Sequence, residues 1–403
     1  MKNGRIDARH ISKKGGLALI RRMVMFMLAG LLLAGCMASG GEREKTENGA
    51  AVPPAGSPPA ETQPASTAPA SPETPASEKQ ADEPVIIAEN LRVPWSIEKF
   101  ESTFYVSERP GSIVKIENGI AERQRVELAK ELSGAAEAGL LGFVLAPDFA
   151  RTKRAYAYYT YEDGAGQFNR LVTLRLDGSV WKEETVLLDR IPSGRVHHGG
   201  RLKIGPDGML YATAGDAADA SLAQNLDSLG GKILRMQLDG SIPDDNPFPG
   251  SYVYSYGHRN PQGLVWAPDG TMYASEHGNR ANDEINIIEP GLNYGWPVIQ
   301  GTERRKGMLT PLFTSGSGTT WAPSGMAYDN GKLYVAALRG TAVMEFDPAA
   351  GTQRKVITGY GRIRDVMIHE DYLYFITNNT DGRGNPQPND DKLYRVPLSA
   401  FAG

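Results

Sequence analysis

Short apolar segments alternate with turns along the chain from residue 84 to the end. The clearest example is residues 196–216, where apolar and polar side chains alternate at 201–204 and again at 209–213. This period of two predicts two antiparallel strands. Pro206-Asp207-Gly208 between them is a turn signal, because proline presets φ and glycine accepts a positive φ. The stretch therefore predicts a hairpin with polar residues at both ends.

The same arrangement of an apolar strand, a turn, a strand rich in tyrosine, a variable loop and a further strand returns six times. No helical periodicity appears after residue 83, and each copy has the length of one four-stranded antiparallel blade. The sequence therefore predicts an all-β fold, a six-bladed β-propeller. An early strand at 85–88 is available to complete the last blade and leave no open edge. The copies begin near residues 95, 142, 202, 264, 326 and 366.

The first 35 residues have the order of a secretory signal, a basic start followed by an apolar run that is too short to span a membrane comfortably. The run ends in Leu33-Ala34-Gly35-Cys36, which resembles a bacterial lipobox. Cys36 is the only cysteine in the chain, so it cannot form an internal disulfide and is better explained as a lipid anchor. We expect an exported protein held at the outer face of the cell membrane.

Residues 36–83 are rich in proline, alanine, serine and glutamate and nearly free of large apolar side chains. Such a segment cannot bury enough surface to fold, so it is predicted to be a disordered tether. The expected organisation is a signal peptide at 1–35, the tether at 36–83 and the propeller at 84–403. Without residues 1–35 the chain keeps 36 basic and 46 acidic side chains, a net charge of −10. This acidity argues against nucleic-acid binding.

Candidate chemistry lies in the loops, which converge at one face of a propeller. Four of the six histidines occur in loops of the third and fourth copies, and the loop at 257–264 adds a guanidinium and an amide. The loop at 275–286 is dense in oxygen donors, which suit calcium rather than zinc. Arginines in the loops of the fifth and sixth copies form an anion site. For each loop, the alternative is an ordinary solvated polar turn. The four histidines are His197, His198, His258 and His277.

Seven motifs in order resemble the pyrroloquinoline quinone (PQQ)-dependent glucose/sorbosone dehydrogenase family over nearly all of residues 85–400. The resemblance implies oxidation of an aldose at C1 to the lactone, with electrons passed to an external acceptor. The motifs are residues 197–202, 205–208, 215–216, 231–235, 239–243, 257–264 and 293–297.

The resemblance also implies roles for individual residues. His197 matches the catalytic base, which takes the proton of the anomeric hydroxyl while hydride passes to the quinone, a task suited to a neutral imidazole. Arg259 matches the arginine beside the quinone oxygen, and Asn260 matches its neighbour at the cofactor. Gly278 and Asn279 match the positions whose backbone carbonyls hold the calcium ion of the cofactor.

Further positions match more peripheral roles in the family. Arg339, Arg362 and Arg364 match the cations that bind the cofactor carboxylates, and Thr320 and Asp216 are lesser candidates at the cofactor. Glu137 matches a substrate-side position. Glu284 and Tyr294 match a second, structural calcium site.

The chain departs from the glucose-oxidising branch of the family at several positions. Val196 replaces an acidic residue, Glu137 and His277 each replace an amide, and a long cysteine-containing insertion is missing. These differences favour the broader aldose sugar dehydrogenase branch. Two other classes stay open: a calcium-dependent propeller lactonase or hydrolase, and a non-catalytic propeller that binds glycan at the cell wall. A homodimer is also left open.

The anchor prediction is tested by Cys36→Ser. Because the thiol is the expected site of lipidation, the variant should move from the membrane fraction to the soluble fraction. Fractionation followed by immunoblotting measures this, with Ser39→Ala as the control that should stay on the membrane. Membrane retention of the Cys36→Ser chain would count against the anchor.

Overall fold

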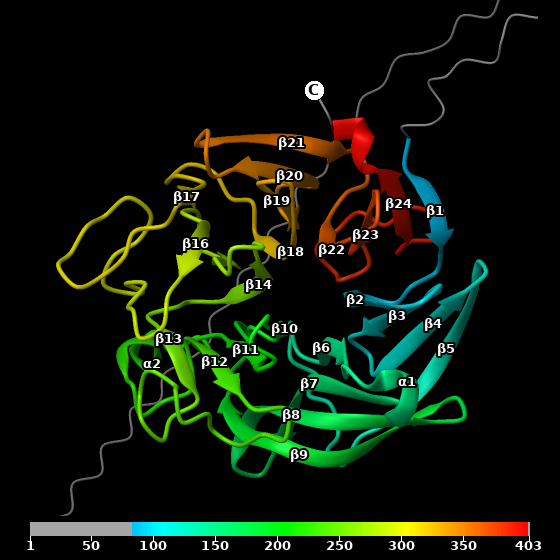
Figure 1. Cartoon of the computed structure of the whole chain (residues 1–403), viewed down its shortest axis with the longest axis horizontal. Helices are drawn as coiled ribbons and strands as arrows, with labels where there is room; N and C mark the ends of the chain where they lie inside the picture. Colours follow the sequence, from blue (N-terminus) through cyan, green and yellow to red (C-terminus); the bar gives the residue numbers. More distant parts are fainter. Residues whose placement is uncertain (1–82, 402–403) are drawn as a thin grey trace, which may run out of the picture. The chain divides into compact units, whose positions relative to one another are not determined.

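The computed structural model describes residues 83–401 of the 403-residue chain (Figure 1). The predicted signal peptide, Cys36 and the tether up to residue 82 lie outside the described residues. The described part is built mainly from antiparallel β-sheet, which confirms the all-β prediction. Among these residues no helix is long and apolar enough to cross a membrane.

Most strands follow one another in four-stranded antiparallel meanders. The first contains β2 (Pro94–Phe100), β3 (Thr103–Glu108), β4 (Ser112–Glu117) and β5 (Ile120–Glu127). The second contains β6 (Leu140–Leu145), α1 (Phe149–Thr152), β7 (Arg154–Asp163), β8 (Gly166–Asp177) and β9 (Val180–Pro192). The third contains β10 (Leu202–Ile204), β11 (Leu210–Ala214), α2 (Ser221–Gln224), β12 (Lys232–Met236) and β13 (Val253–Tyr256).

The C-terminal half repeats this plan. The fourth meander contains β14 (Pro261–Trp266), β15 (Met272–Glu276), β16 (Glu284–Ile288) and β17 (Phe313–Thr314). The fifth contains β18 (Pro323–Asp329), β19 (Lys332–Ala337), β20 (Ala342–Asp347) and β21 (Thr352–Thr358). The last contains β22 (Ile363–His369), β23 (Tyr372–Thr377), β24 (Leu393–Pro397), the 3₁₀ turn η2 (Leu398–Phe401) and, from the start of the described chain, β1 (Val85–Ala88).

The first strands of the meanders contact one another in a closed circuit. β2 contacts β6, and the contacts continue through β10, β14, β18 and β22 back to β2. Figure 1 shows the sheets arranged around a common centre. The fold is therefore propeller-like, and loops distant in sequence meet near this centre.

Strand β1 closes the last sheet, as the sequence predicted. It pairs antiparallel with β24, with Val85 opposite Arg395 and Ile86 opposite Tyr394. The chain thus supplies the outer strand of its last sheet from its other end, so β24 has no open edge.

The first two meanders are not separate sheets, which differs from the expected set of four-stranded blades. Their outer strands β5 and β9 pair in parallel, with Val126 opposite Trp181, and make one eight-stranded sheet. The buried Trp181 lies at this seam, with its ring 5.2 Å from Phe143 and 5.9 Å from Tyr105. Its indole N–H donates to Gln124 Oε1 at 2.8 Å. Apolar packing across the seam explains why the two edges join.

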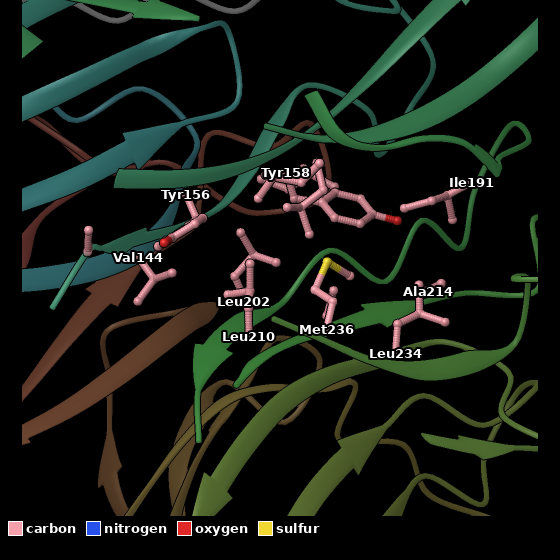
Figure 2. Packing of buried hydrophobic residues seen from close by; sticks show 14 of the residues in the cluster. Val144, Tyr156, Tyr158, Ile191, Leu202, Leu210, Ala214, Leu234 and Met236 are labelled. Carbon is pink, nitrogen blue, oxygen red and sulfur yellow. The ribbon is translucent and has the colours of Figure 1, made fainter. Parts of the chain in front are cut away.

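A buried cluster between the second and third meanders supports the loop that carries His197 (Figure 2). Tyr158, Leu202 and Leu234 are labelled members of this cluster. The hydroxyl of Tyr158 donates to the carbonyl oxygen of His198 at 3.0 Å. The core therefore fixes the backbone directly beside the predicted base.

A buried ion pair lies where the inner strands meet. Arg201 Nη1 is 3.0 Å from Asp365 Oδ2, and both side chains are almost fully buried. The same carboxylate accepts the N–H of Ile97, while Arg201 Nε donates to the carbonyl of Gln262. A Cβ on Gly325 would fall 1.6 Å from Asp365 Oδ1, which explains a glycine at this position.

Trp181→Ala should test the seam. Removing this indole leaves a large cavity between two meanders and should cost about 3–5 kcal/mol of unfolding free energy. Chemical denaturation of the purified protein measures the loss. Ile120→Ala on β5, where the side chain is 72% exposed, is the control and should change stability by no more than about 0.5 kcal/mol. Equal effects of the two variants would contradict the assigned role of the seam.

Candidate active site

The imidazole of His197 is held between a carboxylate and a guanidinium. It lies in the loop between β9 and β10, with Nδ1 at 2.7 Å from Asp216 Oδ1 and Nε2 at 2.9 Å from Arg259 Nη2. A guanidinium can only donate, so Nε2 is the acceptor and Nδ1 carries the proton that is donated to Asp216. The structure therefore presents a neutral histidine whose basic lone pair lies on Nε2.

Asp216 is itself fixed in place. It directly follows Gly215, which comes after β11, and its Oδ2 accepts the indole N–H of Trp296 at 2.9 Å. Its Oδ1 also accepts the backbone N–H of Ala218 at 2.9 Å. Since the carboxylate is buried and held at both oxygens, it fixes the tautomer and the ring plane of His197.

The backbone around His197 is unusual and closely packed. His197 has a φ of 66°, in the left-handed region that few non-glycine residues adopt. Its N–H donates to Glu137 Oε2 at 3.0 Å. A Cβ on Gly215 would lie 2.0 Å from the His197 carbonyl oxygen, so the two loops approach as closely as backbones allow.

Arg259 and Asn260 reach the same place from the loop between β13 and β14. Asn260 Oδ1 accepts the N–H of Gly199 at 2.9 Å, and Arg259 lies over the ring of Trp296 at 5.4 Å. Glu276, the last residue of β15, accepts the backbone N–H of Arg259. The structure thus brings these predicted cofactor residues against the predicted base.

A central pocket is lined in part by His198 and Gly199, which directly follow His197. Unmatched nitrogen atoms lie in and near it. The buried His198 Nε2 and His277 Nε2 have no hydrogen-bond partner, and neither does Arg259 Nε nearby. Burial lowers the pKa of His198 and of His277 to about 4, so both rings are neutral near pH 7. The charged and histidine side chains that line the central pocket are Arg109, Glu137, His198, His277, Arg364, Asp381 and Arg383.

The pocket also has cations that lack a balancing carboxylate. Arg364 donates to Gln262 Oε1 at 2.8 Å and to Asn378 Oδ1 at 3.0 Å, both neutral groups. Burial lowers the pKa of Arg364 to about 9. Within residues 83–401 no carboxylate lies at salt-bridge distance from Arg364 or Arg259. Unpaired guanidiniums and spare donors are what an anionic, multiply hydrogen-bonding ligand requires.

The three arginines of the predicted anion site do not all face the central pocket. Arg364 lines it, whereas Arg339 and Arg362 line an adjoining pocket, here called the side pocket. Arg362 is already paired with Asp381, with Nη2 at 2.7 Å from Oδ2, and Arg339 is exposed. The predicted anion site is therefore divided between two neighbouring pockets, both of which Arg383 also lines.

The loop that carries Gly278 and Asn279 is organised by Asp283. Asp283 Oδ1 accepts the N–H of Gly278 at 2.8 Å, and Oδ2 accepts the hydroxyl of Thr320 at 2.8 Å. Thr320 therefore contacts this loop and is not among the residues that line the central pocket. Asn279 is exposed, and the assignment of both backbone carbonyls to calcium stays a prediction.

Glu284 and Tyr294 lie near the same loop but are held by different partners. The carboxyl of Glu284 accepts the N–H of Gly301 at 3.1 Å, and burial raises its pKa to about 8. The hydroxyl of Tyr294 donates to the Ile287 carbonyl at 2.7 Å. No group of three or more His, Cys, Asp or Glu side chains able to hold a metal occurs within residues 83–401. The second calcium site stays a prediction.

Sequence reasoning missed Arg383, Asp381 and Arg109. Arg383 Nη1 lies 2.7 Å from Glu137 Oε1, although the two residues are 246 positions apart. Arg109 donates to the Ala138 carbonyl at 2.9 Å and lines the central pocket. Arg383 lies in an irregular loop between β23 and β24, and Arg109 lies in the tight turn between β3 and β4, where it looks like any other turn residue. The role of Trp296 could have been suspected, because its motif had been singled out.

Together, the propeller-like sheets carry an oriented histidine beside a pocket lined with arginines, and these form the candidate active site. The model of the Glucose / Sorbosone dehydrogenase family matches residues 91–394, and the chain belongs to this family. The resemblance drawn from the motifs is thereby confirmed.

Similar proteins include the aldose sugar dehydrogenase YliI of Escherichia coli, 32% identical over 341 residues that cover 74% of this chain and 90% of the relative. The structure of the PQQ-bound aldose sugar dehydrogenase of Streptomyces coelicolor has a TM-score of 0.73 and 36% identity, over 78% of this chain and 98% of that one. Quinoprotein glucose dehydrogenase B of Acinetobacter calcoaceticus is 34% identical over 265 residues, 56% of this chain and 54% of the relative.

The buried His198 should make stability depend on pH. Its pKa is about 4 in the folded protein and near 6.5 when unfolded, so the unfolded chain takes up the proton first as pH falls. The contribution of His198 to stability is complete above about pH 6.5 and is lost as pH falls toward 4, by about 2 kcal/mol between pH 7 and pH 5. His277, whose pKa is also lowered to about 4, adds a loss over the same range. Denaturation at a series of pH values measures this.

His198→Gln should reduce that loss, because glutamine does not titrate. His369→Gln is the matched control, since the His369 side chain is 43% exposed. An unchanged pH dependence in His198→Gln would show that the buried ring is not the source.

Proposed function

We propose that this protein is a PQQ- and calcium-dependent aldose sugar dehydrogenase with six propeller blades, one for each meander. In this proposal it oxidises an aldose at C1 to the lactone and passes the electrons to an external acceptor. The observation that carries the proposal is the neutral His197, oriented by Asp216, next to unpaired guanidiniums. Family membership and the similarity to the PQQ-bound Streptomyces coelicolor enzyme support the choice of cofactor and substrate.

The charges and hydrogen-bond donors of the residues present suit a planar tricarboxylate. Arg364 and Arg259 offer uncompensated positive charge, while His277 Nε2 and Arg259 Nε offer unused buried nitrogens. Arg339 and Arg362 in the side pocket would hold further carboxylate groups, and Asn260 would contact the cofactor with its amide. The backbone carbonyls of Gly278 and Asn279 would hold calcium, an ion that accepts such ligands.

The quinone, when bound with its calcium ion, supplies the two-electron acceptor for the hydride that leaves C1. The proton of the anomeric hydroxyl goes to His197 Nε2, the nitrogen that the structure leaves unprotonated. In the resting site this nitrogen accepts from Arg259, so the substrate hydroxyl must replace that donor. The Arg259 guanidinium then stabilises the negative charge that develops nearby.

Asp216 stabilises the positive charge that His197 gains when it takes up the proton. Once Nε2 is protonated the ring is a cation, and the buried carboxylate 2.7 Å from Nδ1 stabilises it. Trp296 keeps Asp216 from turning away through its indole N–H. Orientation and charge stabilisation therefore come from groups that are in place before substrate binds.

The proposal extends to the location of the enzyme. The lipobox-like Leu33-Ala34-Gly35-Cys36 and the proline-rich tether support a lipid-anchored protein at the outer face of the cell membrane. This position would give the site access to external sugars and to an external electron acceptor.

Reconstitution with PQQ, calcium and a panel of aldoses tests the proposal, with dye reduction as the readout. We expect sugar oxidation that requires the quinone and that EDTA abolishes. His197→Asn should bind the quinone as the wild type does but lose turnover by about 10²–10⁴-fold, because the base is gone. Absorbance titration of the quinone measures binding separately.

His369→Asn, at an exposed histidine, is the control and should keep full activity. Full turnover in His197→Asn would remove this residue from the mechanism. A wild-type protein that binds no quinone at micromolar concentration would overturn the proposal as a whole.

A further inference from the structure

An ion pair joins two loops beside the base. Arg383 lies in the loop between β23 and β24, and Glu137 lies just before β6. Arg383 Nη1 is 2.7 Å from Glu137 Oε1, and both residues line the central pocket. The pair therefore connects the last meander to the second beside the predicted site.

Glu137 uses its two oxygens for different tasks. While Oε1 binds Arg383, Oε2 accepts the backbone N–H of His197 at 3.0 Å. Burial opposes ionisation of Glu137, but the His197 N–H and the Arg383 guanidinium outweigh it and lower its pKa to about 2. The carboxylate stays charged at any working pH and remains a strong acceptor.

The N–H group that donates to Glu137 belongs to His197, whose backbone is in a sparsely populated conformation. His197 has a φ of 66°, and such a backbone persists only where its surroundings hold it. Asp216 and Arg259 hold the ring, but among the hydrogen bonds of residues 83–401 the one to Glu137 is what holds the His197 N–H. A displaced carboxylate would let the peptide move and carry the imidazole with it.

Arg383 is fixed from its other side by Asp381. Asp381 Oδ1 accepts the backbone N–H of Arg383 at 2.8 Å, and Oδ2 pairs with Arg362 at 2.7 Å. A continuous path thus runs from Arg362, a predicted cofactor ligand, through Asp381, Arg383 and Glu137 to His197. Each link is a charge-assisted hydrogen bond or a backbone connection of at most two residues.

We infer that Arg383 is a positioning residue for His197, acting through Glu137. It holds the Glu137 carboxylate in the orientation that fixes the backbone of the base, and it ties this orientation to the arginine side of the cofactor pocket. This inference rests on the proposed function in taking His197 as the base. The contacts on which it depends lie within the protein and require no bound cofactor or substrate.

The location of Arg383 argues against a role in folding alone. Its side chain is 49% exposed, and an ion pair exposed to this degree contributes little to stability. Gly382 and Gly384 flank it, in a loop without strand pairing. A guanidinium in such a loop serves the pocket that it lines rather than the hydrophobic core.

The test compares Arg383→Ala with Arg383→Lys in the full-length chain. Hydrogen exchange of a peptide that contains the His197 amide, followed by mass spectrometry without cofactor, reports directly on the Glu137 bond. We expect at least fivefold faster exchange in Arg383→Ala and substantial recovery in Arg383→Lys, which keeps the charge. In the reconstituted enzyme, kcat should fall at least tenfold in Arg383→Ala, while the sugar KM and the quinone Kd change less than threefold.

Arg304→Ala, at an exposed arginine on a remote loop, is the matched control and should match the wild type in every measurement. If Arg383→Ala does not fold, Arg383→Gln serves the same comparison. Unchanged exchange at His197 would overturn the inference, whatever happens to kcat, and so would faster exchange with an unchanged kcat. If the wild type oxidises no aldose with quinone, the proposed function fails, while the exchange experiment still decides whether Arg383 holds His197.

Discussion

The buried ion pair between Arg201 and Asp365 is the interaction on which the arrangement of the sheets depends. Asp365 belongs to β22 and accepts from Ile97 on β2, while Arg201 precedes β10 and donates to Gln262 on β14. Four meanders therefore meet at one pair of charges. A buried pair of this kind is tolerable only when its geometry is good and its remaining hydrogen-bonding capacity is largely met. Here the N–H of Ile97 and the carbonyl of Gln262 supply partners for the pair, while Arg201 Nη2 has no hydrogen-bond partner. The pair therefore depends on correct packing of the inner strands.

In the candidate active site too, at the ends of these strands, groups from different meanders hold one another in place. His197 lies four residues before Arg201. Groups from the second, third and fourth meanders and from the loop after β23 together hold it in position. Glu137, Asp216, Arg259 and Arg383 each come from a different loop. Because a closed ring fixes all of these loops relative to one another, His197 can keep a strained backbone without help from a helix.

Much of the fold could be predicted from the sequence, because its signals are local. Alternating strands and a Pro-Asp-Gly turn marked the hairpin that became β10 and β11, and the apolar stretch at 85–88 marked the closing strand. The seam between β5 and β9 was not predictable, since parallel pairing of two outer edges leaves no period in the sequence. Its main contact, Trp181, has the appearance of any other core aromatic residue.

The candidate site could likewise be predicted only in part. Motifs placed His197, Asp216, Arg259 and Asn260 together, and the structure has them in contact or nearly so. The hydroxyl of Thr320 donates to Asp283, a contact that sequence spacing could not predict because the carboxylate comes from another loop. Its place at the cofactor stays a prediction. The contact of Arg383 with Glu137 could not be predicted from the sequence. Pairing between loops 246 residues apart depends on the three-dimensional arrangement and not on spacing.

The pairing of β1 with β24 has a mechanical consequence. Four residues, Val85–Ala88, both complete the last sheet and connect it to the part of the chain that precedes them. Any tension applied ahead of Val85 reaches this short ladder before it reaches the sheets behind it. A load strong enough to detach β1 would uncover the edge of β24 while the inner circuit of strands stayed in contact. The outermost strand would therefore detach before the strands that hold the loops of the candidate site.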